Sequence, residues 1–127
     1  MTRQTLSLVP VPKPRMTQRD RWQKRPAVMR YRAFCDHIRL LKAQLPPSGT
    51  HVTFVLPMPK SWSAKKKQAM NGKPHTQRPD ADNMLKALCD AIHEEDSGIW
   101  DVRITKVWGE SGQIIIDTPD VGLEVAA

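Results

Sequence analysis

The chain has 127 residues, enough for one hydrophobic core but not for two independent ones, so we expect a single domain spanning residues 1–127. No apolar run approaches the roughly 20 residues of a membrane span, and the first residues lack a signal-peptide core, so the sequence favours a soluble, cytoplasmic protein without a membrane partner. The formal net charge is +7 and it is segregated, because residues 1–79 hold 17 basic and 2 acidic side chains whereas residues 80–127 hold 3 basic and 11 acidic ones.

This charge distribution favours a nucleic-acid partner. A basic surface attracts polyanions, and a phosphate backbone is the commonest polyanion in a cell. The acidic half would repel the same backbone unless cations neutralise it. A DNA-binding face around a metal-filled acidic pocket reconciles the two halves, and the alternative is an ordinary basic protein with an acidic tail.

The N-terminal segment predicts an edge strand followed by a basic arm. Residues 6–10 are short, partly alternating and ended by a proline, as in an edge strand. Pro10, Pro12 and Pro14 exclude regular structure up to Arg15. Residues 1–26 are therefore expected to form a partly extended arm that lies along DNA phosphates, unless its charges are simply solvated. The basic residues assigned to this contact are Lys13, Arg15, Arg19 and Arg21.

The middle of the chain predicts a helix, a strand and a basic loop. Residues 27–45 have the apolar spacing of a helix, and Pro46–Gly49 ends it. Residues 51–56 are β-branched and aromatic, which indicates the central strand. Cys35 and Cys89 fall among helical apolar residues and are expected to be buried free thiols.

The basic loop over residues 60–78 leads directly into the acidic part of the chain. Ser61 or Ser63 can cap a short helix that reaches Met70, and Trp62 is expected to pack rather than to stack on a base. The lysines and the arginine of this loop are placed to hold a phosphate backbone. They are Lys65, Lys66, Lys67, Lys73 and Arg78.

Two carboxylates one residue apart, Asp80 and Asp82, follow Pro79 and begin a strong helical pattern. A proline biases the preceding backbone towards an extended form, in which residues i and i+2 share a side, so both can converge on one cation. The apolar spacing predicts a helix to about Glu94, with Lys86 one turn beyond Asp82. The alternative is that Asp80 is only an N-cap and Asp82 only a first-turn acid.

The last part of the chain predicts two strands and a frayed tail. The strands cover residues 99–108 and 113–117, and residues 119–127 form the tail. Ile114, Ile115 and Ile116 are expected to be buried on both faces or to lie in a dimer interface. The order β-α-β-(α)-α-β-β predicts an α+β fold, a two-layer single domain with a mixed β-sheet packed with two main helices.

The pattern Pro79-Asp80-x-Asp82-Asn83-x-x-Lys86-Ala87-x-x-Asp90-Ala91, followed by Glu95-Asp96 and a strand with Lys106, resembles the RusA family of Holliday junction resolvases. Pro57-x-Pro59-x-Ser61-Trp62-Ser63 and Gly72-x-Pro74-His75 resemble phage-type members. The resemblance implies a RusA-like fold and a dimeric, Mg²⁺-dependent endonuclease, with Mn²⁺ able to substitute. The implied partner is branched DNA, in particular four-way junctions, in recombination and repair.

The resemblance also implies roles for individual residues. Asp80, Asp82 and Asp96 would be the metal-binding catalytic carboxylates, and hard oxygen ligands of this kind suit magnesium. Lys86 would orient the attacking water or stabilise the transition state. Asn83 would orient an aspartate, and Asp90 would be structural. Many relatives carry Asp-Asp-Ser-Gln where this chain has Glu95-Asp96-Ser97-Gly98, so no role is assigned to Glu95.

Other catalytic schemes fit the sequence poorly. The four histidines show no metal-ligand spacing, and no Gly-rich phosphate loop or nucleophile elbow is present. Two alternatives stay open. One is a non-catalytic basic DNA-binding accessory protein whose acids serve as helix caps, and the other is a nuclease for RNA or for other branched forms.

Overall fold

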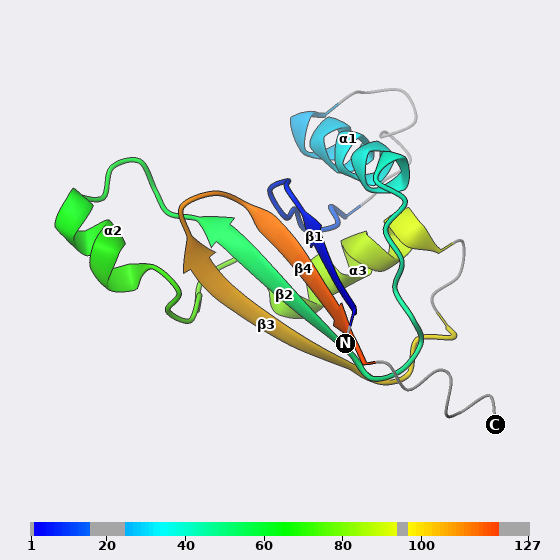
Figure 1. Ribbon diagram of the computed structural model, residues 1–127. Coiled ribbons are helices and arrows are strands. Elements are labelled where there is room, and N and C mark those ends of the chain that lie inside the picture. Colours follow the sequence, from blue (N-terminus) through cyan, green and yellow to red (C-terminus); the bar gives the residue numbers. More distant parts are fainter. Residues whose placement is uncertain (1, 16–24, 94–96, 120–127) are drawn as a thin grey trace.

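Four strands form one mixed sheet in the order β1-β4-β2-β3 in the computed structural model, which describes residues 2–15, 25–93 and 97–119 (Figure 1). β4 is antiparallel to β1 and to β2, whereas β2 and β3 are parallel. The elements are β1 (Thr2–Leu6), α1 (Pro26–Leu40), β2 (Thr50–Pro57), α2 (Ala64–Met70), α3 (Ala81–Ile92), β3 (Val102–Gly109) and β4 (Gln113–Thr118).

The alternation of β2 decides which face of the sheet is buried. Val52 and Phe54 are fully buried, and their neighbours along the strand are half-buried on the other side. Their partners across the sheet, Ile116 and Ile114 of β4, are also fully buried. The strand predicted at residues 51–56 is therefore confirmed, and it lies between β4 and β3.

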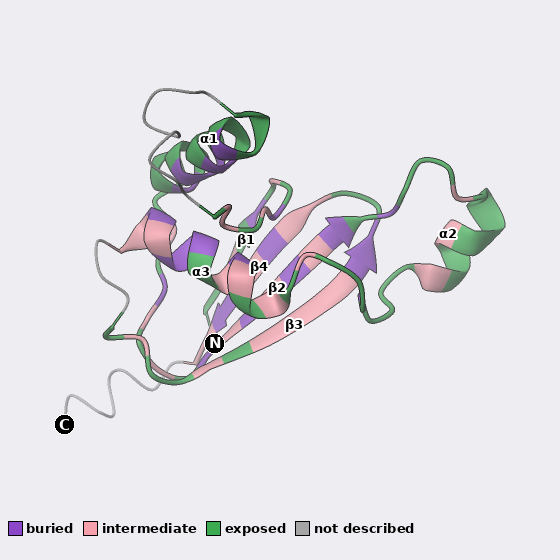
Figure 2. Cartoon of the chain, turned by 180° about the vertical axis from the view of Figure 1, so that it is seen from behind, coloured by how far each residue is buried: buried purple, intermediate pink, exposed green. Residues whose placement is uncertain are grey.

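Helix α3 lies across this buried face with α1 packed beside it, so the domain has two layers (Figures 1 and 2). The periodic apolar positions of α3 meet the sheet, and Met84, Ala87 and Leu88 have no exposed surface. Val28 and Ile38 of α1 are buried as completely. The predicted fold class, a two-layer α+β domain with two main helices on a mixed sheet, is confirmed.

Helix α2 extends from the end of β2, away from the two-layer body (Figure 1). The Ser63 hydroxyl caps it by accepting a hydrogen bond from the Lys66 amide at 3.2 Å, which settles the choice between the two serines. Trp62 packs on Trp108 of β3, with ring centroids 4.8 Å apart, as the sequence predicted. None of the described helices is long and apolar enough to cross a bilayer.

Three predicted bounds were wrong, and one of them is that of β3, which begins at Val102 rather than at residue 99. The first strand covers Thr2–Leu6 rather than residues 6–10, because pairing with β4 and not apolar alternation defines it. Helix α1 ends at Leu40 rather than at Leu45, since Lys42 has a φ of +54° and turns the chain. Leu45 is buried all the same, so the apolar spacing continues past the end of the helix. Cys35 and Cys89 are buried free thiols, as predicted.

The other face of the sheet carries no helix in the part of the chain that the structure describes (Figure 1). Ile115 is half-buried on this face, between the fully buried Ile114 and Ile116, so the triplet is not buried on both sides. An ion pair lies at the β1 edge, where the Arg3 guanidinium donates to the two Asp117 carboxylate oxygens at 2.6 and 3.1 Å. These bonds hold the pKa of Asp117 below its ordinary value of 3.8.

We predict that this ion pair makes stability pH-dependent. A carboxyl whose pKa is lower in the folded state stabilises the fold above its ordinary pKa, and this contribution disappears as the pH falls through the folded pKa. Asp117→Asn should therefore lose less unfolding free energy than the wild type between pH 7 and about pH 3 in urea titrations. Arg3→Met should show the same flattening. An unchanged pH dependence in both variants would contradict the assignment.

Candidate active site

The N-terminal end of α3 carries the two aspartates that the sequence singled out. Asp80 occupies the N-cap position with extended backbone (φ −70°, ψ 144°), and its carbonyl accepts the first helical hydrogen bond from Met84 at 3.1 Å. Its carboxylate, however, makes no capping hydrogen bond. The side chain is exposed, so Asp80 does not serve as an ordinary cap.

The expected geometry of the pair needs a correction. The helix already begins at Ala81, so Asp82 lies in the first helical turn and the alternation of an extended segment does not apply. What the two carboxylates share is the exposed N-terminal end of α3, where the helix dipole favours negative charge. Lys86 is also exposed and lies one turn beyond Asp82 on the same helix, as predicted.

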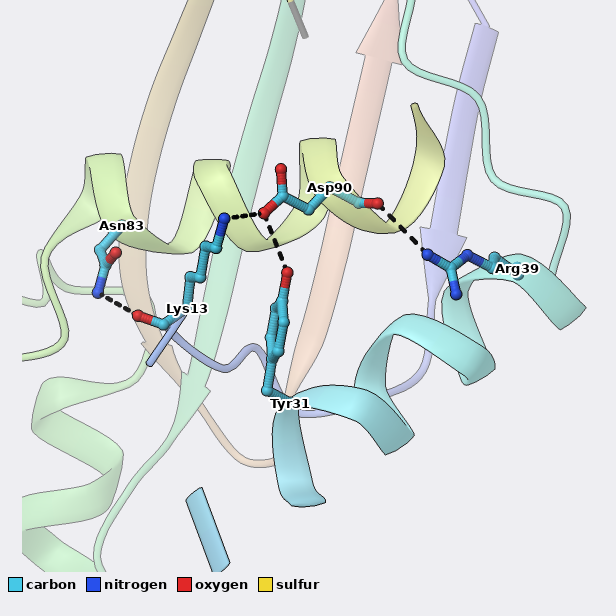
Figure 3. A network of polar contacts seen from close by, with 5 residues as sticks. All are labelled: Lys13, Tyr31, Arg39, Asn83 and Asp90. Carbon is cyan, nitrogen blue, oxygen red and sulfur yellow. Dashed lines mark hydrogen bonds and ion pairs between the residues drawn. The ribbon is translucent and has the colours of Figure 1, made fainter. Parts of the chain in front are cut away.

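The proline-rich arm runs beside this end of the helix (Figure 3). The Asn83 amide donates to the Lys13 carbonyl at 3.2 Å, and the Lys13 amide donates to the Asn83 carbonyl at 3.4 Å. Asn83 therefore holds the arm, and among the described residues its side chain is bound to Lys13 rather than to an aspartate. The arm is placed against α3 by paired backbone and side-chain hydrogen bonds.

Asp90, two turns further along α3, binds the same residue of the arm, Lys13 (Figure 3). Its carboxylate accepts a hydrogen bond from the Tyr31 hydroxyl at 3.0 Å and forms an ion pair with the Lys13 ammonium at 2.5 Å. Burial raises the pKa of Tyr31 far above its ordinary value, so this hydroxyl stays a donor. Asp90 thus joins the arm, α1 and α3, in agreement with the structural role predicted for it.

Arg39 of α1 binds carbonyls at the C-terminal end of α3 (Figure 3). Its guanidinium donates to the Ala91 carbonyl at 3.1 Å and to the Asp90 carbonyl at 3.5 Å. The last turn of α3 has no basic residue of its own, so α1 supplies the cation that its orphan carbonyls favour. The helix is therefore held near its N-terminal end by the main chain of the arm and at its C-terminal end by the Arg39 side chain.

Two adjoining hollows follow the N-terminal half of α3. The first, of about 480 Å³, contains Asp80 and is otherwise lined by Pro12, Arg78, Pro79 and Asn83. The second, of about 490 Å³, is lined by Lys13, Pro14, Arg15, Asn83 and Lys86. Asn83 borders both, so the two hollows adjoin along the helix and are together called the channel below; Asp80 and Arg78 line the first, and Lys13, Arg15 and Lys86 line the second. A strand of nucleic acid could lie along such a channel, with its phosphates facing the basic side chains.

The remaining basic residues of the predicted DNA-binding set have different surroundings. Lys65, Lys66 and Lys73 are exposed on and beside α2, and Lys67 is half-buried. The Lys66 ammonium lies 4.4 Å from the centre of the Trp62 ring, a cation–π contact. Lys13 already has Asp90 as its ion-pair partner. Arg19 and Arg21 lie outside the described residues, as does the carboxylate Asp96.

The carboxylates at the helix end fit a divalent cation in their chemistry. Carboxylate oxygens are the hard ligands that Mg²⁺ prefers, and exposure leaves room for the waters that the ion retains. Within residues 2–15, 25–93 and 97–119, no cluster of three metal-binding side chains occurs. Asp80 and Asp82 therefore have no third metal-binding side chain beside them among the described residues, and the third predicted carboxylate, Asp96, lies outside those residues.

The sequence analysis named Lys106 as part of the family pattern but assigned it no role. Lys106 of β3 donates from its ammonium to the Gln77 and Pro79 carbonyls, both at 2.7 Å, and so contacts the segment that delivers Asp80. The signal was present, because Lys106 falls on the inward phase of its strand together with Ile104 and Trp108. A lysine at a core-facing position requires a polar partner, and the carbonyls provide it.

An α+β domain with a carboxylate pair and a basic channel at one exposed helix end has the features of a small nuclease. A family model described as Endodeoxyribonuclease RusA matches residues 8–118, most of the chain. The chain therefore belongs to the RusA endodeoxyribonuclease family, whose members resolve Holliday junctions. No curated protein matches the sequence at a significant level.

We predict that Asp90 anchors the arm. In Asp90→Asn the Lys13 ammonium loses its ionic partner, so the free energy of unfolding should fall by about 1 kcal/mol, as befits a partly exposed charged hydrogen bond. The amides of Val11, Lys13 and Arg15 should exchange with solvent faster. Asp36→Asn is the matched control, since it removes an exposed carboxylate whose ion pair with Arg39 spans 3.7 Å. Equal exchange of the arm in the wild type and Asp90→Asn would contradict the assignment.

Proposed function

We propose that this protein is a homodimeric, Mg²⁺-dependent endonuclease, with Mn²⁺ able to substitute, that cuts four-way DNA junctions in recombination and repair. It would act in the cytoplasm of a bacterial or phage-infected cell. Membership of the RusA family supports the endonuclease activity and the junction substrate. The proposal adds the metal, the assembly and the residues.

The observation that carries the proposal is that the Asp80 carboxylate is exposed and makes no capping hydrogen bond. A carboxylate at an N-cap position ordinarily accepts a hydrogen bond from the first helical turn, and this one does not. Together with Asp82 it leaves two exposed, negatively charged groups at one helix end, beside Arg78 and the arm. A carboxylate that makes no capping hydrogen bond and stays exposed is available to bind a cation.

Different residues of the chain would bind the metal, orient the water and bind the DNA backbone. Asp80 and Asp82 would hold the metal, and when bound the metal supplies an activated water and neutralises charge on the phosphoryl oxygens. Lys86, one turn along α3, orients the water or stabilises the charge that develops on the phosphate. Arg15 and Arg78 line the hollows on either side and bind the backbone of the cut strand.

The exposed lysines of the α2 region provide a second contact with the substrate. Lys65, Lys66 and Lys73 lie on an extension that leaves the two-layer body, well placed for an arm of a junction. Phosphate contacts of this kind position the substrate without reading its sequence. They favour binding by shape, which agrees with a substrate defined by its branch.

A homodimer is proposed for two reasons. Paired cuts on opposed strands of a symmetric junction call for two active sites related by a two-fold axis. In addition, Asp80 precedes the 12-residue helix α3 in the sequence, whereas Asp96 follows it. A partner chain brings a second Asp96 and can thereby complete each set of ligands.

We predict that Asp82→Asn lowers the rate of junction nicking in Mg²⁺ by at least about 100-fold, because it removes a charged metal ligand while keeping the side-chain shape. Junction affinity in a gel-shift assay without Mg²⁺ should stay near that of the wild type. Asp36→Asn, which alters an exposed aspartate on α1, is the matched control and should cut normally.

Nicking by Asp82→Asn at the wild-type rate would refute the assigned site. Junction binding by the wild type without any Mg²⁺- or Mn²⁺-dependent cutting would favour the non-catalytic accessory role instead. Preferential cutting of RNA or of flaps in the same assay would change the substrate but keep the chemistry.

A further inference from the structure

Lys106 occupies an unusual place for a lysine. In the parallel register of β2 and β3 it pairs with Phe54, which is fully buried, and it shares the inward phase of its strand with Ile104 and Trp108. Lysine is rarely placed on the core side of a sheet unless its ammonium has defined partners. Here the stem lies along the core side and the ammonium reaches its edge.

The partners are two main-chain carbonyls, those of Gln77 and Pro79, each at 2.7 Å. The Pro79 carbonyl belongs to the same peptide group as the Asp80 nitrogen, so the ammonium acts one peptide group away from the aspartate. Hydrogen bonds from a charged donor are stronger and shorter than neutral ones. Lys106 therefore constrains where the backbone of Asp80 begins.

Main-chain hydrogen bonds to β3 fix residues 72–75, which precede the two carbonyls that Lys106 binds. Gly72 donates to the Trp108 carbonyl at 2.8 Å, Trp108 donates to the Lys73 carbonyl at 3.0 Å, and His75 donates to the Lys106 carbonyl at 3.0 Å. Beyond His75 the chain leaves the strand edge to reach α3. The ammonium of Lys106 bridges this departure by binding the carbonyls at positions 77 and 79.

The surroundings of Lys106 suit a fixed positive charge. His75 is 5 % exposed, and its ring packs 4.2 Å from that of Trp108. Burial, and then the positive charge of Lys106, lower the pKa of His75, so the ring stays neutral near pH 7. The His75 ring therefore adds no second positive charge beside Lys106.

We propose that Lys106 is a positioning residue that sets the Asp80 carboxylate for the divalent ion by clamping the Gln77 and Pro79 carbonyls. This inference rests on the proposed function, in which Asp80 is a metal ligand. Lys106 does not contact the ion or the reacting phosphate. It acts as outer-shell partners of metal sites act, by fixing the ligand before the metal arrives.

The test measures Mn²⁺ binding directly, because a purely structural lysine would not change it. Lys106→Met keeps the apolar stem and removes the donors, and by analogy with other outer-shell partners it should weaken Mn²⁺ binding in calorimetric titrations about 10- to 100-fold. Amides of residues 76–83 should exchange faster in the metal-free variant. Arg103→Met is the matched control, because it removes the same charge from the same strand on the uncovered face and should bind Mn²⁺ as the wild type does.

Junction cutting supplies a second readout. The Mg²⁺ concentration that gives half the maximal nicking rate should rise in Lys106→Met, while junction affinity without metal is unchanged. If Lys106→Met does not fold, Lys106→Gln decides the question, since its amide keeps a polar group at the position and should still weaken Mn²⁺ binding.

The possible outcomes separate the two proposals. A folded Lys106→Met or Lys106→Gln that binds Mn²⁺ with wild-type affinity overturns the positioning role. Mn²⁺ binding by the wild type without junction cutting overturns the proposed function alone, and the calorimetric comparison still judges Lys106. Failure of the wild type to bind Mn²⁺ overturns both.

Discussion

The burial of one face of α3 against the sheet is the constraint on which the site depends. Met84 and Leu88 have no exposed surface, so the helix cannot rotate or slide without exposing them to water. Fully burying a side chain of this size contributes roughly 1.5–3 kcal/mol, which makes such a shift costly. With that face fixed, Asp82 and Lys86 must point outwards, and Asp80 must stand at the exposed N-terminal end of the helix. The position of the acidic pair is thus a consequence of core packing.

In the fold, the basic N-terminal arm lies against α3, which begins the acidic half of the sequence. The basic arm does not stay apart from the acidic half, because Lys13 is tied to α3 through Asn83 and Asp90 (Figure 3). This contact brings Arg15 and Lys86 together around one hollow, next to the hollow that holds Asp80. Cations gathered beside carboxylates allow a polyanion to approach an acidic site that would otherwise repel it. The arm therefore acts as part of the site rather than as a separate tail.

The sequence predicted what depends on local periodicity and missed what depends on distant partners. The alternation at residues 51–56 and the apolar spacing of α3 were sufficient, because each reflects a single buried face. β1 was misplaced because its polar residues become a strand only by pairing with β4, as Gln4 does with Ile116. The contacts of Asn83 and Lys106 join residues 70 and 27 to 29 positions apart, and no spacing rule reaches across such distances. The paired aspartates were found from their spacing, although the helix begins earlier than that reasoning assumed.

The central claim is that Asp80 and Asp82 together ligate a divalent cation, and a crystal structure with Mn²⁺ and junction DNA bound tests it most directly. The anomalous signal of Mn²⁺ locates the ion without reference to any assumed ligand. The account predicts a peak about 2.1 Å from a carboxylate oxygen of each aspartate, with Asp96 of one of the two chains as a further ligand. A peak elsewhere, with both carboxylates free of metal while DNA occupies the channel, would contradict it.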